Sequence, residues 1–371
     1  MKKSKITMLV ALILSFSLLL TACGDSNSDI NANGLETEET EGTEETEETF
    51  DLEALKNGPE TSLILGYSAP EGNAGDKACK EGAAALSEKT NEKFNITIYP
   101  AGQLGGDREE IEAVQLGDQD IFKGASSALV TFVPDLAIFD MPIVFSQYSR
   151  EQVQKVLDGE VGDFSEKINI AFEKAGFKLL RIYSTDTYRT MSSNIPVHSI
   201  EDFNGIRIRT MENKYHMNFW NSLGASATPV NFAELYVALQ QGMVDAQENV
   251  VSGLVASGQY EQVDYIMDTN HILFFNTLVM NNAKYDSLTI TQKQLLEEYI
   301  SYVVDKEVEL TADENEAYAQ QAKDYGIEFI ELDDATISAM NERAKSTVDM
   351  ISNDVGQDLV DSLFNSLEQA N

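Results

Sequence analysis

Residues 205–249 constrain the fold more than any other stretch of this 371-residue chain, because strand and helix signals alternate there over a short length. The segment GIRIRT is predicted as a short strand, and two helical segments and the turn sequence VDAQEN follow it. Such alternation is typical of α/β folds. The stretch offers an arginine at a strand end, a phenylalanine before a helix and an asparagine after a second strand. These residue types suit the binding of a small anion.

The same alternation continues from residue 58 to the C-terminus, without an internal repeat. About 310 residues are too many for one typical domain and enough for two. One uninterrupted helix at residues 292–325 is long enough to contact both domains. Asp107 is expected to cap the short helix at residues 107–116. We predict strands at residues 62–67, 95–99, 120–123, 178–183, 205–210, 244–247, 264–267, 272–280 and 326–332, and helices at 76–90, 107–116, 166–175, 292–325 and 334–367.

The N-terminus predicts export. Three lysines precede an apolar run of 15 residues at positions 6–20, which is shorter than the ~20 residues that span a bilayer. A basic start followed by a short apolar core is typical of a secretory signal. Leu20-Thr21-Ala22-Cys23-Gly24 then resembles the bacterial lipobox, in which cleavage leaves a lipidated cysteine. Lipidation of Cys23 would anchor the mature chain to the membrane without spanning it.

An acidic segment follows the cysteine. Residues 25–53 carry twelve Asp or Glu and no Lys or Arg, with repeated Glu-Thr pairs. Such a segment repels itself and buries little apolar surface, so we predict a disordered tether. The whole chain has a formal net charge of −36, which argues against nucleic acid as a partner. It does not exclude a small organic anion, because a cleft arginine acts at contact range while distant charges are screened.

Catalytic signatures are scarce. The three histidines, His198, His216 and His271, show no metal-ligand spacing, and GQLGG at residues 102–106 is predicted as a turn before a helix. We therefore predict no catalytic group, no metal and no cofactor.

Arginine is the informative residue type, because a guanidinium pairs with both oxygens of a carboxylate. Side chains alternate along a strand, so Arg207 and Arg209 lie on the same face. The pattern alone does not show which of the two binds an anion. It also leaves open that both form ion pairs at the surface. Arg189 follows a strand and is expected near the boundary of the two lobes. Phe232 suits either a core or the floor of a pocket, and Asn249 can both donate and accept hydrogen bonds.

These motifs resemble the solute-binding proteins of tripartite ATP-independent periplasmic (TRAP) transporters. The resemblance covers residues 62–363 and rests on several motifs in the family's order. They are the strand ending in Arg209, the segments LGASATPV and AELYVALQQGMVDAQEN that follow it, YPAGQLGGDRE at residues 99–109, and TNHIL at 269–273.

The resemblance implies a fold and roles for particular residues. The fold is α/β, a two-lobed periplasmic binding protein type II-like fold with hinge strands and a long helix bracing both lobes. Arg209 would be the main carboxylate clamp and Arg189 the second arginine at the cleft. Phe232 would pack on the ligand and Asn249 would hydrogen-bond it. The first lobe would contribute Ser68 and the turn at Ala125 and Ser126.

Two positions depart from the family pattern. The family often has Val-Pro after the clamp arginine, whereas this chain has Thr210-Met211-Glu212. Glu212 is expected either to accept hydrogen bonds from ligand hydroxyls or to cap the helix that begins there. Members that bind sialic acid carry an acid where this chain has Ala125, which disfavours sialic acid.

The expected function is a lipid-anchored extracytoplasmic receptor that delivers a small organic acid to TRAP membrane permease subunits. A sugar acid such as a uronate or a four-carbon dicarboxylate is the expected ligand. An extracellular lipoprotein hydrolase and a ligand-presenting sensor are the alternatives. The predicted organisation is a signal peptide at residues 1–22, a tether at 23–57, a first lobe at 58–186 and 275–314, and a second lobe at 187–274 and 315–371.

Overall fold

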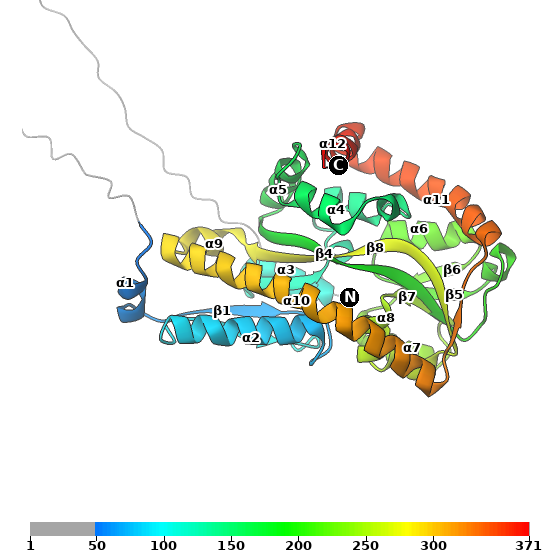
Figure 1. Cartoon of the computed structure of the whole chain (residues 1–371), viewed down its shortest axis with the longest axis horizontal. Coiled ribbons are helices and arrows are strands. Elements are labelled where there is room, and N and C mark those ends of the chain that lie inside the picture. The colour runs from blue at the N-terminus through cyan, green and yellow to red at the C-terminus, as the bar shows by residue number, and fades with distance from the viewer. Residues whose placement is uncertain (1–48, 371) are drawn as a thin grey trace, which may run out of the picture. The chain divides into compact units, whose positions relative to one another are not determined.

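The computed structural model describes residues 49–370, so the predicted signal peptide, Cys23 and most of the tether lie outside the described residues. One mixed sheet organises this part of the chain, with the strand order β2-β1-β3-β8-β4-β7-β5-β6 and β9 paired with β8 (Figure 1). The strands are β1 (Thr61–Gly66), β2 (Phe94–Tyr99), β3 (Ile121–Ala125), β4 (Phe177–Ser193), β5 (Arg207–Thr210), β6 (Ser226–Pro229), β7 (Ala246–Asn249), β8 (Tyr265–Asn281) and β9 (Glu328–Ile330).

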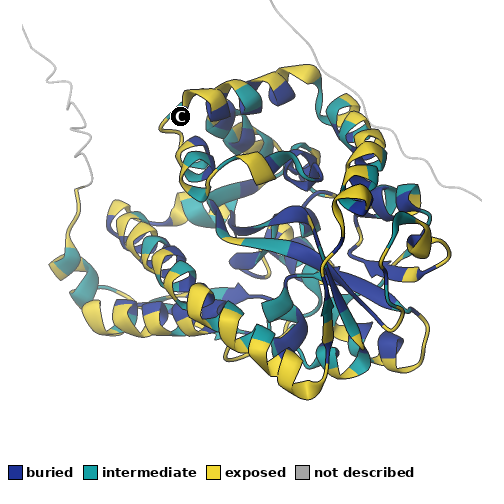
Figure 2. Ribbon diagram, turned by 45° about the vertical axis from the view of Figure 1, so that its right-hand side comes forward, coloured by how far each residue is buried: buried dark blue, intermediate teal, exposed yellow. Residues whose placement is uncertain are grey.

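Helices cover the sheet, and their outer sides carry the exposed residues while buried residues concentrate in the strands (Figure 2). No helix within residues 49–370 combines the length and the apolar character that crossing a bilayer requires. The α-helices are α1 (Leu52–Asn57), α2 (Ala74–Lys89), α3 (Asp107–Leu116), α4 (Arg150–Leu157), α5 (Phe164–Lys174), α6 (Lys214–Leu223), α7 (Leu235–Gln240), α8 (Val251–Ala256), α9 (Asn282–Ser287), α10 (Ile290–Tyr325), α11 (Asp334–Val355) and α12 (Gln357–Gln369).

The sheet has two parallel halves joined by antiparallel strands. Strands β1, β2 and β3 form one half, and β5, β6 and β7 form the other. We name these the β1–β3 half and the β5–β7 half. Strands β4 and β8, of 17 residues each, pair with each other and connect the halves.

The pairing of β4 with β8 breaks at one place. Ser184 pairs with Phe275 and Tyr188 pairs with Leu273, with a register shift between these pairs. Asp186 within this bulge has a φ of 58°. A bulge bends a strand and re-aims its side chains, so β4 bends at this break. The predicted lobe boundaries at residues 186 and 274 fall at this break.

Both long strands exceed their predicted lengths. The polar sequence at 184–193 gives no apolar alternation, yet it continues β4 because its side chains pack in a polar interior. Likewise the predicted strands at 264–267 and 272–280 merge into β8, since His271 between them is fully buried.

Helix α10 packs against both halves, as predicted. Leu295, Ile300 and Val303 share a core with Leu63 of β1 and Ala78 of α2. Further along the same helix, residue 322 joins the core formed by α7 and α8. A continuous 36-residue helix therefore braces the two halves (Figure 1).

Three regions differ from the predicted organisation. Helix α1 lies inside the predicted tether, because Asp51 caps it and Leu52 and Leu55 pack on the core beside α10. The predicted helix at 334–367 is divided at Gly356, which has a φ of 86°. Helix α12, assigned to the second lobe, packs against α4 and α5, which fall within the predicted first lobe.

Candidate functional site

A cavity of about 160 Å³ opens where the carboxyl ends of four parallel strands meet. Residues that follow or end β1 and β3 line one wall, and residues that end β5 and β7 line the other. The bulge of β4, the middle of β8 and α10 close the remaining side. The carboxyl ends of parallel strands are the usual ligand site of open α/β sheets.

Arg209 stands at the end of β5 and lines this cavity. Only 3% of the residue is exposed, and burial lowers the pKa of its guanidinium to about 10. Its Nε donates a hydrogen bond to the carbonyl oxygen of Val230 at 2.8 Å, and its guanidinium carbon lies 5.9 Å from the ring centre of Phe232. Among residues 49–370 it forms no ion pair, and it lines both this cavity and a smaller adjacent one.

Arg207 has a different environment although it shares the strand face. Its side chain is 49% exposed and forms an ion pair with Asp245, and its Nε donates to the same carboxylate at 2.9 Å. The structure thus separates the two arginines that the strand pattern left together.

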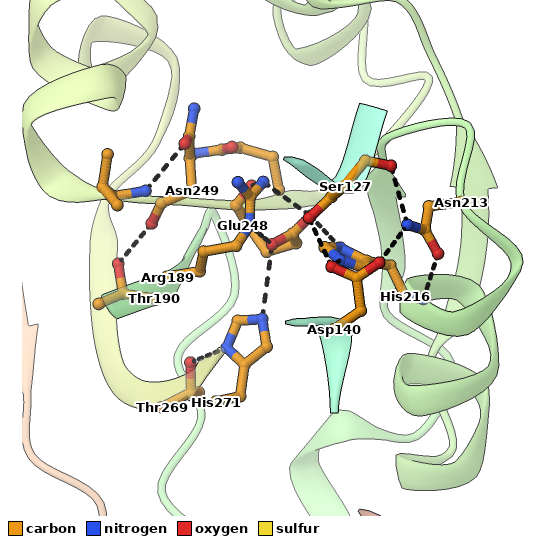
Figure 3. Close-up of polar contacts among 12 residues, drawn as sticks. Ser127, Asp140, Arg189, Thr190, Asn213, His216, Glu248, Asn249, Thr269 and His271 are labelled. Atoms are coloured by element: carbon orange, nitrogen blue, oxygen red, sulfur yellow. Dashed lines mark hydrogen bonds and ion pairs between the residues drawn. The ribbon is translucent and has the colours of Figure 1, made fainter. Parts of the chain in front are cut away.

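Arg189 also lines the cavity, but its charge is already paired. Its Nη2 donates to Glu248 Oε1 at 2.9 Å and to the Glu248 carbonyl oxygen at 2.8 Å, and its Nε bonds to Oε2 (Figure 3). Both residues are essentially buried. Glu248 therefore fixes the orientation of Arg189 from behind the cavity.

Two of the three histidines belong to the same buried network. His216 lies between Glu248, 3.1 Å from its Nδ1, and Asp140, 3.2 Å from its Nε2. Burial alone would lower the pKa of His216, but Glu248 and Asp140 raise it to about 9. His271 Nε2 lies 3.4 Å from Glu248 Oε2, and its Nδ1 contacts Thr269 Oγ1 at 2.9 Å (Figure 3). Burial would raise the pKa of Glu248, yet Arg189 and His216 hold it well below its usual range.

Phe232 and Asn249 are also placed in the cavity wall. The ring of Phe232 is half-buried beside Arg209 and also packs against the core formed by α7 and α8, so it lies between that core and the cavity. Asn249 ends β7, and its Oδ1 accepts a hydrogen bond from the backbone N–H of Val250 at 2.9 Å. Its amide nitrogen is not engaged by a described residue and can donate into the cavity.

Ser68 lines the cavity from the β1–β3 half, and its hydroxyl bonds to Asp107. Asp107 is the first residue of α3, and the cap position belongs to Gly106, so the predicted capping role of Asp107 is wrong. Its carboxylate faces the cavity instead. Burial raises the pKa of Asp107, with Ser68 and Arg209 acting in the opposite direction.

Two predicted site residues do not line this cavity. The Ser126 hydroxyl lies 2.5 Å from Thr277 Oγ1 and is buried beneath the β3 end, so Ala125 is the residue of that turn that faces the cavity. Glu212 lines an adjacent cavity of about 60 Å³ and lies 3.3 Å from Arg108 Nη1. Its alternative role as a helix cap is also wrong, because Asn213 caps α6.

Sequence reasoning missed Lys123, Glu307 and Glu248. Lys123 and Glu307 both line the cavity, although 184 residues separate them in the chain. No local pattern reveals such a pair, because α10 brings Glu307 to β3 only in the fold. Glu248 had a usable signal, since it directly precedes Asn249 on a strand and must point to the opposite face. Among residues 49–370 no group of three or more His, Cys, Asp or Glu side chains is arranged to hold a metal ion.

Several known proteins are similar to this chain in sequence and in fold. A family described as bacterial extracellular solute-binding protein, family 7 (DctP), matches residues 65–354. The C4-dicarboxylate-binding periplasmic protein DctP of Rhodobacter capsulatus is 30% identical over 307 residues, covering 80% of this chain and 89% of that protein.

Two solved structures are also similar. The sugar acid binding protein DctPAm from Advenella mimigardefordensis, in complex with galactonate, matches with a TM-score of 0.78 at 22% identity, covering 84% of this chain and 99% of that one. A TRAP periplasmic solute binding protein from Polaromonas sp. JS666, bound to D-erythronate, matches with a TM-score of 0.74 at 26% identity, covering 82% and 98%.

These matches confirm the predicted periplasmic binding protein type II fold and the predicted kind of protein. The family consists of extracellular solute-binding components rather than enzymes, which agrees with the prediction of no catalytic group. The chain therefore belongs to the DctP family, family 7 of the bacterial extracellular solute-binding proteins.

Proposed function

We propose that this protein captures a small organic acid outside the cytoplasm and delivers it to the membrane permease subunits of a TRAP transporter. Three relatives support an organic-acid ligand, since their names record a C4-dicarboxylate, galactonate and D-erythronate. Sugar acids, uronates and dicarboxylates are therefore the ligand classes to test.

The environment of Arg209 carries this proposal. Arg209 is 3% exposed and forms no ion pair among residues 49–370. Burying an unpaired charge costs free energy, and a ligand carboxylate would offset that cost by pairing with the guanidinium. A ligand carboxylate would accept two parallel hydrogen bonds from the free side of the guanidinium. Arg189, held by Glu248, would add a second set of donors beside it.

The other predicted site residues have complementary roles. Phe232 would pack on the ligand next to Arg209, and the Asn249 amide would donate to it. Ser68 and Ala125 would contact it from the β1–β3 half. A ligand that touches both halves binds the closed form more tightly than the open form, so binding shifts the population toward closure.

Arg209→Ala tests the clamp. We expect the affinity for the best acid from a thermal-shift screen to fall at least tenfold, since ~1.4 kcal/mol corresponds to each factor of ten. Isothermal titration calorimetry measures the change. Arg207→Ala is the matched control on the same strand and should bind as the unmodified protein does. Equal affinity of the Arg209→Ala protein would contradict the proposal.

We also propose that Cys23 is lipidated and anchors the protein to the cell membrane. The residues Leu20–Gly24 and the tether after them support this proposal. Cells fed radioactive palmitate should label the unmodified protein, and Cys23→Ser should abolish the label and release the protein from the membrane fraction. Labelling that survives the substitution would refute the anchor.

A further inference from the structure

The cavity has a second charged end, formed around Lys123 of β3 and Glu307 of α10. We propose that this end selects ligand hydroxyl groups and disfavours a second carboxylate, so that the ligand is a hydroxylated monocarboxylate. This inference rests on the proposed function, in which Arg209 binds the one carboxylate of the ligand.

Lys123 and Glu307 form a nearly buried ion pair. Lys123 Nζ lies 2.9 Å from Glu307 Oε2 and 3.2 Å from Oε1, and the side chains are 5% and 9% exposed. Tyr183 Oη donates to Glu307 Oε2 at 2.6 Å, and Asn276 Nδ2 lies 3.5 Å from Oε1. Four elements, β3, β4, β8 and α10, therefore converge on one carboxylate, which fixes its position.

Lys123 and Arg209 line the cavity from different halves of the sheet. Lys123 lies on β3 in the β1–β3 half, and Arg209 lies on β5 in the β5–β7 half. The two cationic groups thus belong to different walls of the cavity. A ligand of several carbons can place its carboxylate at one end and its remaining groups at the other.

A second carboxylate would find no uncompensated charge near Lys123. Glu307 already neutralises the ammonium, and Glu314 adds another carboxylate to the cavity wall. At the N-terminus of α2, Glu314 already accepts the Ala74 N–H at 2.8 Å and pairs with Lys77 at 2.7 Å, which adds negative charge beside this end of the cavity. Burying a carboxylate there would leave it unpaired, which is unfavourable.

Hydroxyl groups fit the same surroundings. An ammonium has three N–H donors, and Glu307 is the one hydrogen-bond partner of Lys123 among residues 49–370. A hydroxyl can accept from Lys123 and donate to the Glu307 carboxylate, whose position is fixed. Gly75 keeps the approach open, since a Cβ there would lie 2.8 Å from Lys123 Nζ and 3.0 Å from Glu307 Oε1.

The sequence suggested Glu212 either as an acceptor for ligand hydroxyls or as a helix cap, but it pairs with Arg108 in the adjacent cavity. Among the carboxylates that line the main cavity, Glu307 is the one that pairs with Lys123, and the proposal gives it the acceptor role.

The test compares D-erythronate, galactonate, succinate and butyrate by calorimetry on the unmodified protein. We expect at least one hydroxylated acid to bind tenfold or more tightly than succinate, and butyrate to bind more weakly than the hydroxylated acid. Succinate binding as tightly as the best hydroxylated acid would overturn the inference.

Two variants test whether Lys123 and Glu307 cause the preference for a hydroxylated acid over succinate. Glu307→Gln leaves Lys123 without its counter-charge, so the preference for the hydroxylated acid over succinate should fall at least tenfold. If that protein does not fold, the double variant Lys123→Met with Glu307→Leu removes both charges, and it should lose the hydroxylated acid while keeping butyrate binding. An unchanged preference in the folded variant would overturn the inference.

Failure of the proposed function gives a different pattern. Arg209→Ala should weaken all four acids together, whereas Glu307→Gln should change their ratio. If no acid binds the unmodified protein, or if Arg209→Ala binds them as well as the unmodified protein does, the carboxylate clamp itself is wrong.

Discussion

Glu248 is the residue on which the buried charges of the β5–β7 half converge. It contacts Arg189 at the cavity and both His216 and His271 behind it. A buried carboxylate with three cationic or polar partners is well compensated, whereas loss of one partner leaves the others unpaired. The orientation of Arg189 toward the cavity therefore depends on residues that never touch a ligand.

The raised pKa of His216 makes the free energy of unfolding depend on pH. Its pKa in the folded protein, about 9, exceeds the ordinary value of 6.5, so its contribution is fully present below pH 6.5 and is lost as the pH rises through about 9. We expect the free energy of unfolding, measured in urea, to fall between pH 6.5 and 9. Glu110, whose pKa burial raises to about 8, acts in the same direction at the lower part of this range.

A matched pair of variants isolates the histidine. His216→Gln should flatten the fall in unfolding free energy between pH 6.5 and 9 relative to the unmodified protein. His198→Gln, at an exposed position, should leave the fall unchanged. A His216→Gln protein with the same pH dependence as the unmodified protein would show that this histidine is not charged in the fold.

Five site residues predicted from the sequence line the cavity, and their contact with a ligand stays a prediction: Arg209, Arg189, Phe232, Asn249 and Ser68. Local pattern does not decide which of two neighbouring residues faces inward. It left Arg207 and Arg209 equivalent, and Arg207 pairs with Asp245 because β5 lies beside β7 in one register. Ser126 turns away from the cavity while Ala125 faces it. Neither fact is encoded within a few residues of the position concerned.

At the level of elements, the N-terminus of α3 meets the loop after β6 beside the smaller, adjacent cavity. Gly106 has an ordinary φ of −78°, so its backbone does not require glycine. A Cβ there would lie 2.1 Å from Asn231 Nδ2, and Asn231 is held by its Oδ1, which accepts from the Ala233 N–H at 3.0 Å. Glycine at this position is therefore needed for the approach of the two halves.

Gly106→Ala tests that contact. We expect affinity to fall roughly tenfold, because the closed form becomes less populated. The melting temperature without ligand should change little, since the other close neighbour of the methyl group is the mobile end of the Glu109 side chain. Asn231→Ala on top of Gly106→Ala removes the clash and should restore part of the affinity. A single variant that binds normally would show that closure does not bring these residues together.

Elements with strong local signals were predicted well, including α10 with Gly326 at its C-terminal end. Helix α4 was missed, although Ser149 and Gln152 form a capping box at its start. The polar half of β4 was also missed. Its buried side chains serve a network and a cavity rather than an apolar core, so hydrophobic alternation is absent there.

At the scale of the whole molecule, β4, β8 and α10 join the two halves of the part that the structure describes. The bulge between Ser184 and Tyr188 lies in the cavity wall, and Thr185 and Thr187 line the cavity. If the halves hinge at this position, a ligand that contacts Thr185 or Thr187 would directly affect the angle between the halves. The lobe boundary predicted from the sequence falls at this bulge and stays a prediction, while the packing of α12 against α4 and α5 followed from no local pattern.

A crystal structure with the tightest-binding acid of the panel tests the central claim most directly. We expect both carboxylate oxygens of the ligand within hydrogen-bond distance of the Arg209 guanidinium, with the ligand in contact with residues of both halves. A ligand carboxylate bound at Lys123, or a ligand outside the cavity with Arg209 still unpaired, would contradict the account.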